Sequence, residues 1–403
     1  MKYKKICSII LVLIFFSASS VGCTKKDSSK DAKQINIYVG IKDTKSLSDL
    51  KNLFDGYKKE NAGIKMNITS SIGNIMEENT STSIPDIMFI SRNDMIKLVN
   101  KGLLSDIKSY NEENKIDERY FSIFNSYGRI NDKSYGVPIL TSTLEVLYNM
   151  DAINKLKLNE PKDSASIREL IKNLNKGSVR IPVVINENKY INSELFSLLV
   201  NNTIDISKLD GEYDGGLEAY KNIQMNRPFD ILKTMVKDDI LGKYTFEIGN
   251  ESTMNKFDKG DIPLIVATSA HINELKSSSI KCYDNHSKYK EVIPVIAEAL
   301  VCVPTGSKNS EEVSKLIKYM FSETAQKNII QSGAVTGNKS LKDLNKGLAG
   351  IISAHLEKAD ESAIIYTDKL PEKLKDAMES KIDLILSGKF SNNEWEDILK
   401  SIY

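Results

Sequence analysis

Short apolar segments alternate with longer amphipathic ones along most of the chain, and this alternation restricts the fold more than any other feature. The segment INIYVG (35–40) is followed by a stretch in which Leu47, Leu50, Phe54 and Tyr57 recur at three- and four-residue steps. That pattern predicts a strand followed by an amphipathic helix. IKMNIT and PDIMFIS begin further units of the same kind. We therefore expect an α/β fold with a largely parallel sheet.

The loops that follow the predicted strands are the first candidates for a binding site. In open α/β sheets, ligands bind outside the carboxyl ends of the strands, where the chain leaves the core. In this sequence that rule points to GIKDT (40–44), SRND (91–94) and ATSAH (267–271). Topology alone therefore predicts ligand contacts in these three loops.

The N-terminal stretch has the composition of an export signal. Three lysines precede an unbroken apolar run, residues 9–16, which is too short to cross about 30 Å of hydrocarbon as a helix. The sequence SSVGC follows, and this order of features is typical of a secretory signal. We predict that residues 1–22 are removed and that Cys23 carries a diacylglycerol anchor. The alternative is a cysteine that merely lies near a cleavage site.

Charge and hydropathy exclude other classes of partner. Removal of the signal takes away three lysines and no acid, so the formal net charge falls from +1 to −2. A chain with such balanced charge is not expected to bind nucleic acid. The polar residues 23–34 cannot form a core and predict a solvated tether. No later segment has about eighteen consecutive apolar residues, so no further membrane span is predicted.

Two cysteines remain for the mature body, because Cys7 leaves with the signal and Cys23 is predicted to carry lipid. Cys282 and Cys302 both lie in strand-like segments. In an exported chain such an even pair is compatible with a disulfide. A bridge that closes a loop of about twenty residues would add roughly 3 kcal/mol to the free energy of unfolding. Two buried free thiols are the alternative, and spacing leaves both open.

Five stretches carry a resemblance to a known family. They are PDIMFISRNDMIKLVNKGLLSDI (85–107), SYGVPILTSTLEVLYNMDAI (134–153), FDKGDIPLIVATSAHINEL (257–275), VPTGSKNSEEVSKLIKYMFSETAQ (303–326) and LILSGKFSNNEWEDILKSI (384–402). In this order they resemble segments of extracellular solute-binding proteins of the maltose-binding type (family 1). Together they cover most of the mature chain.

The resemblance implies a two-lobed, periplasmic-binding-protein-like α/β fold with a hinge and an interlobe ligand cleft. The predicted parts are the signal peptide 1–22, the tether 23–34, an N-terminal lobe of 35–141 and 299–325, and a C-terminal lobe of 142–298 and 326–403. It also implies a monomeric, lipid-anchored, extracytoplasmic subunit of an ABC importer. This subunit would deliver a small solute, most simply a carbohydrate, to a permease. The alternative is a ligand-sensing or degenerate lipoprotein with a signalling or adhesive role.

The resemblance also carries over a set of candidate ligand contacts. They are Lys42, Asp43, Arg92, Asn93, Asp94, Ser142, Glu187, Tyr190, Ser269 and His271. Sugar sites in this family usually combine stacking aromatic rings with carboxylates and amides. Here Asn93 and Ser142 stand where the family has carboxylates, and Ile90 and Ala270 stand where it has tryptophans. We therefore expect a small solute rather than a long oligosaccharide.

Several of these candidates have a structural alternative. Arg92, Asn93 and Asp94 suit the cap of a helix that begins near Met95, because Asn and Asp are favoured at helix N-termini. His271 suits a structural or hinge-facing role. The single tryptophan, Trp395, lies in the predicted C-terminal helix pair, where packing is the simplest reading.

The sequence offers no support for catalysis. Its three histidines, at positions 271, 286 and 355, show no metal-binding spacing. It also lacks the G-x-S-x-G elbow, the phosphate-binding loop and the dinucleotide fingerprint. We therefore predict a binding protein with no enzymatic activity, no metal and no cofactor.

Overall fold

The computed structural model describes most of the chain that follows the predicted signal and tether. The described residues are 33–70, 84–187, 189–211, 213, 215–284, 291–331 and 334–403. The predicted signal peptide, the predicted lipidation site Cys23 and nearly all of the predicted tether lie outside them, as does His286. Among the described helices, none combines the length and the apolar character that a membrane span requires.

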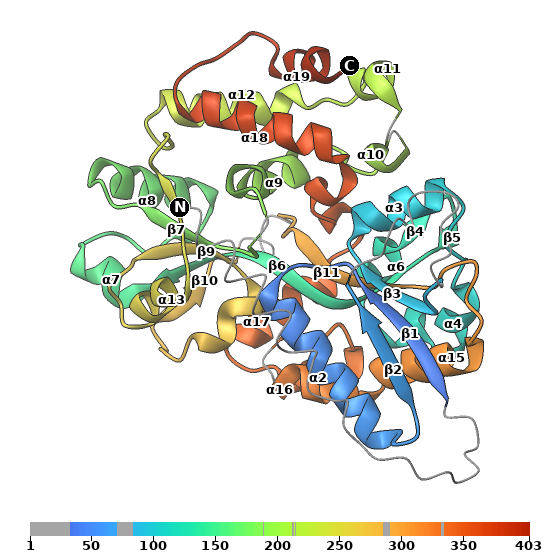
Figure 1. Ribbon diagram of the computed structural model, residues 1–403. Coiled ribbons are helices and arrows are strands. Elements are labelled where there is room, and N and C mark those ends of the chain that lie inside the picture. Colours follow the sequence, from blue (N-terminus) through green and yellow to red (C-terminus); the bar gives the residue numbers. More distant parts are fainter. Residues whose placement is uncertain are drawn as a thin grey trace, which may run out of the picture. The chain divides into compact units, whose positions relative to one another are not determined.

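One mixed sheet organises the described chain, in the strand order β2-β1-β3-β11-β6-β9-β7-β8, with β10 paired to β6 (Figure 1). The strands are β1 (Gln34–Val39), β2 (Lys65–Thr69), β3 (Ile87–Ile90), β6 (Val137–Asn149), β7 (Ile181–Val184), β8 (Phe246–Ile248), β9 (Leu264–Thr268), β10 (Ile280–Cys282) and β11 (Val295–Cys302). A separate hairpin pairs β4 (Arg129–Ile130) with β5 (Lys133–Ser134).

The sheet contains two parallel groups joined by two antiparallel strands. β1 pairs in parallel with β2 and β3, and β7 pairs in parallel with β8 and β9. Between these groups, β6 and β11 run antiparallel to each other and to their outer neighbours. All residues of β3, β7 and β9 are buried, which fits strands covered on both faces. The expected α/β class with two lobes is confirmed, and β6 and β11 connect the lobes. The expectation of a largely parallel sheet is wrong, because the pairs made by β6, β10 and β11 are antiparallel.

The helices around β1–β3 follow the predicted amphipathic pattern. α2 (Thr44–Glu60) buries Leu50, Leu53, Phe54 and Tyr57 and packs against α15 (Ser310–Met320) and α16 (Glu323–Gln331). The same half of the chain holds α3 (Arg92–Asn100), α4 (Lys108–Glu113), α5 (Ile116–Arg119) and α6 (Ser122–Tyr127). The predicted strand and helix at 35–60 are therefore confirmed.

A second apolar core lies among helices that pack on one another rather than on β1–β3 (Figure 1). α9 (Ile191–Thr203) and α12 (Asn226–Lys237) pack against α18 (Glu372–Leu386), which packs against α19 (Glu394–Ile402). Trp395 is buried there and its indole N–H donates to the carbonyl of Tyr220 at 2.9 Å. The expected packing role of this tryptophan is confirmed.

The remaining helical segments include two of more than ten residues, α8 and α17, and otherwise short pieces. They are α7 (Met150–Lys155), α8 (Ser164–Lys176), α10 (Lys208–Gly211), α11 (Gly216–Lys221), α13 (Glu251–Asp258), α17 (Leu348–Lys358) and the 3₁₀ segments η1 (Ser269–Glu274), η2 (Lys339–Leu344), η3 (Glu361–Ala363) and η4 (Tyr366–Lys369). The residue boundaries proposed above for the two lobes stay a prediction.

The two cysteines of the mature body are free, buried thiols far apart in the sheet. Cys282 in β10 pairs with Leu147 of β6, whereas Val301, next to Cys302 in β11, pairs with Val137 of β6. Ten residues along one strand separate the pairing positions by roughly 30 Å. Because a disulfide needs Cα atoms within about 7 Å, the structure has the second alternative, two unbridged cysteines.

Candidate functional site

A residue of β6 and a residue of the loop after β7 meet at Glu298 of β11. Ser142 Oγ donates to Glu298 Oε1 at 2.7 Å, and the side-chain amide of Asn186 donates to Oε2. Nearby, Thr44 Oγ1 at the start of α2 donates to Glu187 Oε2 at 3.3 Å. These contacts join the loop after β1 to the loop after β7. Of the three strand-end loops expected to carry a site, 40–44 therefore lies against the loop after β7, which was not among the three.

Glu298 is a half-buried carboxyl in a strand that is otherwise nearly all apolar. Its pKa is raised to about 7, chiefly by burial and to a smaller extent by the nearby carboxylates of Asp43 and Asp368. Lys189 and the hydrogen bond from Ser142 act in the opposite direction. Near neutral pH this group therefore exists in both protonation states, so it can either accept or donate a hydrogen bond.

Lys189, in the loop after β7, brings a positive charge close to several acidic side chains. Its Nζ lies 3.7 Å from Asp368 Oδ1 and 4.0 Å from Glu194 Oε1. Burial alone would lower the pKa of Lys189, but Asp368, Glu194 and Glu298 together raise it. The pKa of Glu194 is also raised, chiefly by burial. The ammonium of Lys189 therefore interacts electrostatically with three carboxyl groups, those of Asp368, Glu194 and Glu298.

Four buried polar atoms in this region have no hydrogen-bond partner among the described residues. They are Asn186 Oδ1, Glu194 Oε2, Thr268 Oγ1 and His271 Nε2. Native structures satisfy the great majority of buried polar groups, so such atoms call for a ligand or water. Asn186 and Glu194 follow β7, Thr268 ends β9 and His271 lies in the segment after β9. We call these residues together with Glu298, Ser142 and Lys189 the cleft cluster.

Some predicted ligand residues have clear structural duties. Asp43 is the N-cap of α2 and accepts from Ser46 N at 2.8 Å. Ser269 Oγ is buried and accepts from the backbone N–H of Thr143 at 2.9 Å. Burial lowers the pKa of His271, although the Glu274 carboxylate opposes that shift. Asp43 nevertheless lies beside the cleft cluster, since its carboxylate acts on the pKa values of both Glu298 and His271.

Arg92 is buried, and its side chain connects α3 to other segments of the chain. Its guanidinium donates to the carbonyls of Tyr127 and Asp368, both at 3.0 Å, and pairs with Asp210 at 2.8 Å. The N-cap of α3 is Ser91, one residue earlier than the expected cap, and its hydroxyl donates to Asp94 at 2.8 Å. Asp94 thus serves the start of the helix.

Asn93, Tyr190, Lys42 and Glu187 complete the predicted set. The hydroxyl of Tyr213 lies 3.2 Å from Asn93 Oδ1. Tyr190 is 38% exposed, and its hydroxyl donates to Asp376, the main reason that its pKa rises to about 12. Lys42 and Glu187 are exposed on the facing loops. Their contact with a ligand stays a prediction.

Sequence reasoning missed the centre of the cleft cluster. Glu298, Asn186, Lys189 and Glu194 were not among the expected contacts. One signal was available for Glu298, because IAEAL places a single acid in an apolar strand, and buried acids are rare without a partner. The positions of the others depend on where α9 and the loop before it fold against β11.

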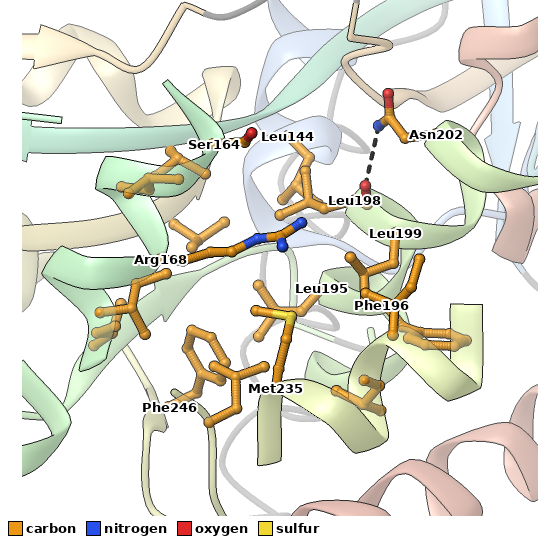
Figure 2. Close-up of a pocket in the computed structure, with 18 of the residues that line it drawn as sticks. Leu144, Ser164, Arg168, Leu195, Phe196, Leu198, Leu199, Asn202, Met235 and Phe246 are labelled. Atoms are coloured by element: carbon orange, nitrogen blue, oxygen red, sulfur yellow. Dashed lines mark hydrogen bonds between the residues drawn. The ribbon is translucent and has the colours of Figure 1, made fainter. Parts of the chain in front are cut away.

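An apolar cavity lies elsewhere, between the sheet and α8, α9 and α12. It measures about 470 Å³, and apolar side chains dominate its lining, among them Leu144, Leu195, Phe196, Met235 and Phe246 (Figure 2). A much smaller space of about 20 Å³ touches Glu298, which is enough for about one water. The apolar cavity has too few converging polar groups to suit a solute rich in hydroxyls.

Comparison with known proteins gives a family and a fold. Residues 52–351, more than half of the chain, match the family described as "Bacterial extracellular solute-binding protein". A putative binding protein of Brucella abortus (strain 2308) is 20% identical over 326 residues, which cover 73% of each chain.

Two solved structures show the same fold at low identity. The sugar-binding protein MalE from Xanthomonas citri gives a TM-score of 0.68 at 14% identity and covers 92% of this chain and 96% of its own. The GacH receptor of Streptomyces glaucescens gives a TM-score of 0.66 at 15% identity and covers 92% and 97%.

Proposed function

Because the chain belongs to the bacterial extracellular solute-binding proteins, we propose that it is the carbohydrate-binding, membrane-anchored subunit of an ABC-type importer. It would bind a small sugar at the cleft cluster, close around it and deliver it to a permease. The likeness to the sugar-binding protein MalE in fold supports a carbohydrate over other solutes. Catalysis is not part of the proposal.

The observation that carries the proposal is the set of buried polar atoms without partners. They are Asn186 Oδ1, Glu194 Oε2, Thr268 Oγ1 and His271 Nε2, and the side-chain amide of Asn186 also donates to Glu298. Carboxylate and amide oxygens accept hydrogen bonds, and each sugar hydroxyl offers one donor. Tyr190 adds an exposed ring on which a pyranose face can stack. With no tryptophan nearby, this set suits a solute of one or two rings.

Closure follows from contacts on both lobes. Thr44 and Glu187 lie on facing loops and hydrogen-bond to each other, as do Asn93 and Tyr213. A ligand that touches both loops binds the closed state more tightly than the open one and so shifts the population toward it. A hundredfold preference corresponds to about 2.7 kcal/mol.

Calorimetric titration of the full chain with a panel of mono- and disaccharides tests this function. Asn186→Ala and Glu298→Gln should each weaken binding of the identified sugar by about tenfold or more, because both remove a partner that ligand burial requires. Asn202→Ala is the matched control. Its amide donates to Val292 O at 2.9 Å beside the apolar cavity, so its affinity should not change. If no sugar of the panel binds the wild type, the proposed transport function is wrong. The alternative is then a ligand-sensing or degenerate lipoprotein with a signalling or adhesive role.

The lipid anchor has a separate test. Two acyl chains hold a protein stably on a membrane, whereas one holds it weakly. Cys23→Ala should therefore release the protein from membranes or leave it unprocessed, while the wild type partitions into detergent. Equal detergent partitioning of both proteins would remove the anchor from the proposal.

A further inference from the structure

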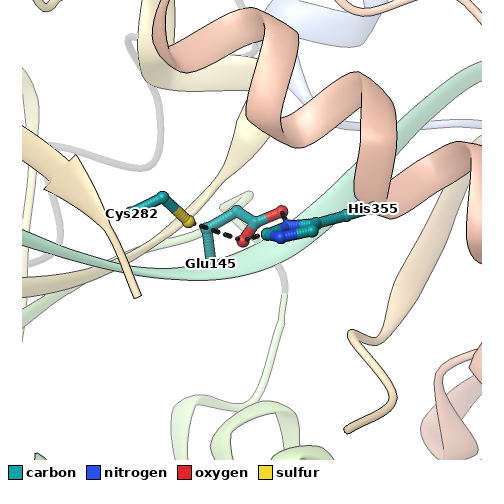
Figure 3. A group of neighbouring side chains, drawn as sticks. All are labelled: Glu145, Cys282 and His355. Carbon is teal, nitrogen blue, oxygen red and sulfur yellow. Dashed lines mark hydrogen bonds and ion pairs between the residues drawn. The ribbon is translucent and has the colours of Figure 1, made fainter. Parts of the chain in front are cut away.

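Three side chains of metal-binding type converge between β6, β10 and α17. Glu145, Cys282 and His355 come from these three elements and point toward one another (Figure 3). Cys282 Sγ lies 3.2 Å from Glu145 Oε2, and His355 Nδ1 lies 3.1 Å from Oε1 and 3.2 Å from Oε2. One ligand atom from each residue lies within 4.8 Å of the other two. All three residues are buried.

Two further residues orient this trio. Thr143 Oγ1 donates to Glu145 Oε1 at 2.5 Å, and His355 Nε2 lies 3.4 Å from Asp284 Oδ1. A histidine that binds a metal through one nitrogen commonly gives its other N–H to a carboxylate, which fixes the tautomer and the ring plane. Asp284 stands at that position relative to His355.

The distances from Glu145 to the other two residues agree with a tetrahedral ion. Zinc bonds of about 2.0 to 2.3 Å and tetrahedral angles place neighbouring ligand atoms roughly 3.3–3.6 Å apart. The contacts of 3.1–3.2 Å around Glu145 need to open by only a few tenths of an ångström. A thiolate and an imidazole favour zinc-like cations over Ca²⁺ and Mg²⁺, which take oxygen ligands.

We propose that Glu145, Cys282 and His355 form a binding site for a zinc-class divalent cation, supported by Asp284 and Thr143. The three residues leave the fourth tetrahedral position for a water molecule. Binding converts the Cys282 thiol to a thiolate and requires His355 Nδ1 without a proton, so those protons pass to the solvent. The ion would tie α17 to the lobe-connecting strand β6.

Charge supports the proposal over a simple hydrogen-bonded cluster. Two carboxylates, Glu145 and Asp284, face a single imidazole, and a thiol lies against one of them. A thiol gains little from a neighbouring carboxylate in a buried place, whereas a cation satisfies the carboxylate, the sulfur and the imidazole together.

Cobalt titration of the full chain, purified with chelator and then freed of it, tests the site. We expect one equivalent of Co²⁺ to give a near-ultraviolet charge-transfer band from sulfur to cobalt, and Zn²⁺ to abolish that band by competition. Cys282→Ser should remove the band. Cys302→Ser is the matched control, since Cys302 is an equally buried thiol in β11, and it should keep the band. His355→Gln should weaken cobalt binding by tenfold or more.

A second measurement does not depend on the fold of the Cys282 variant. In the Cys302→Ser background, Zn²⁺ should slow alkylation of Cys282 by tenfold or more and raise the melting temperature, and a chelator should reverse both effects. Absence of the band and of zinc-dependent protection would overturn the site and leave a hydrogen-bonded cluster. A band that survives Cys282→Ser would overturn it too, since the sulfur ligand would then lie elsewhere in the chain.

Discussion

Two glutamates on the two lobe-connecting strands have opposite surroundings. Glu145 of β6 is only 1% exposed and meets a histidine, a thiol and a hydroxyl, all from strands or a helix. Glu298 of β11 is half-buried and meets a hydroxyl, an amide and an ammonium, partly from loops. Glu145 therefore lies in a site built from strands and a helix, whereas Glu298 on the paired strand lies in a site built partly from loops.

Solvent access explains the difference. A carboxylate closed off from water must find all its partners within the protein, because the low dielectric makes an unmatched charge costly. A carboxylate at the edge of loops can leave neighbouring polar atoms unmatched, since water or a ligand reaches them. The comparison predicts that Glu145 and its partners matter for stability, whereas Glu298 and its partners matter for binding.

The largest expected effect comes from breaking the buried pair. His355→Leu leaves Glu145 without its imidazole partner, and removing one member of a buried ion pair typically costs about 3–5 kcal/mol of unfolding free energy. Urea unfolding in the presence of a chelator measures this loss without any contribution from a metal. His271→Leu is the control on the cleft side, where the pKa of the imidazole is lowered and its loss should cost less than about 1 kcal/mol. An equal loss of unfolding free energy in His355→Leu and His271→Leu would contradict the proposed difference between the two sites.

A smaller effect concerns the cleft. Tyr190 is exposed and directly follows Lys189 in the chain, so Tyr190→Ala should remove a stacking face and weaken sugar binding by about tenfold, or about 1.4 kcal/mol. Its stability without ligand should stay close to that of the wild type. Tyr244→Ala is a matched control, because Tyr244 is also exposed but follows α12. Calorimetric titration that shows equal affinities for both variants would remove Tyr190 from the site.

Sequence patterns could predict the fold because its signals are local. The strand at 35–40 and the helix with Leu50, Leu53, Phe54 and Tyr57 follow from periodicity within about twenty residues. The five segments that resemble the family also predicted the correct architecture, because each is a local pattern of consecutive residues. Arg92 shows the limit, since nothing nearby in sequence reveals that it is buried against Tyr127 and Asp210.

The trio of metal-binding type could not be predicted from spacing. Cys282 lies 137 residues and His355 lies 210 residues from Glu145 along the chain. Sequence motifs for metals place their ligands a few residues apart on one helix or loop. Here the pairing of β10 with β6 and the packing of α17 on β6 create the cluster. Tertiary structure is therefore the only source of that signal.

The smallest expected effect is the pH dependence of stability at Glu298. Its pKa is about 7 in the folded chain and its ordinary value is 4.5. Between these values the folded state holds a proton that the unfolded state has released, so this group makes the free energy of unfolding fall as pH rises from about 4.5 to 7, and the loss is complete above that. Because the carboxyl is partly solvated, we expect about 1 kcal/mol between pH 5 and pH 8.

Urea unfolding at pH 5 and pH 8 measures that change. Glu298→Gln cannot release a proton, so the stability of this variant relative to wild type should rise by about 1 kcal/mol from the lower pH to the higher one. Glu247→Gln, at an exposed position in β8, is the control and should follow the wild-type pH profile. Because all other titrating groups are common to the three proteins, their contributions cancel in the differences. Parallel profiles for wild type and Glu298→Gln would show that Glu298 is charged throughout, like a fully solvated acid, and the contrast with the enclosed Glu145 would then rest on hydrogen bonding alone.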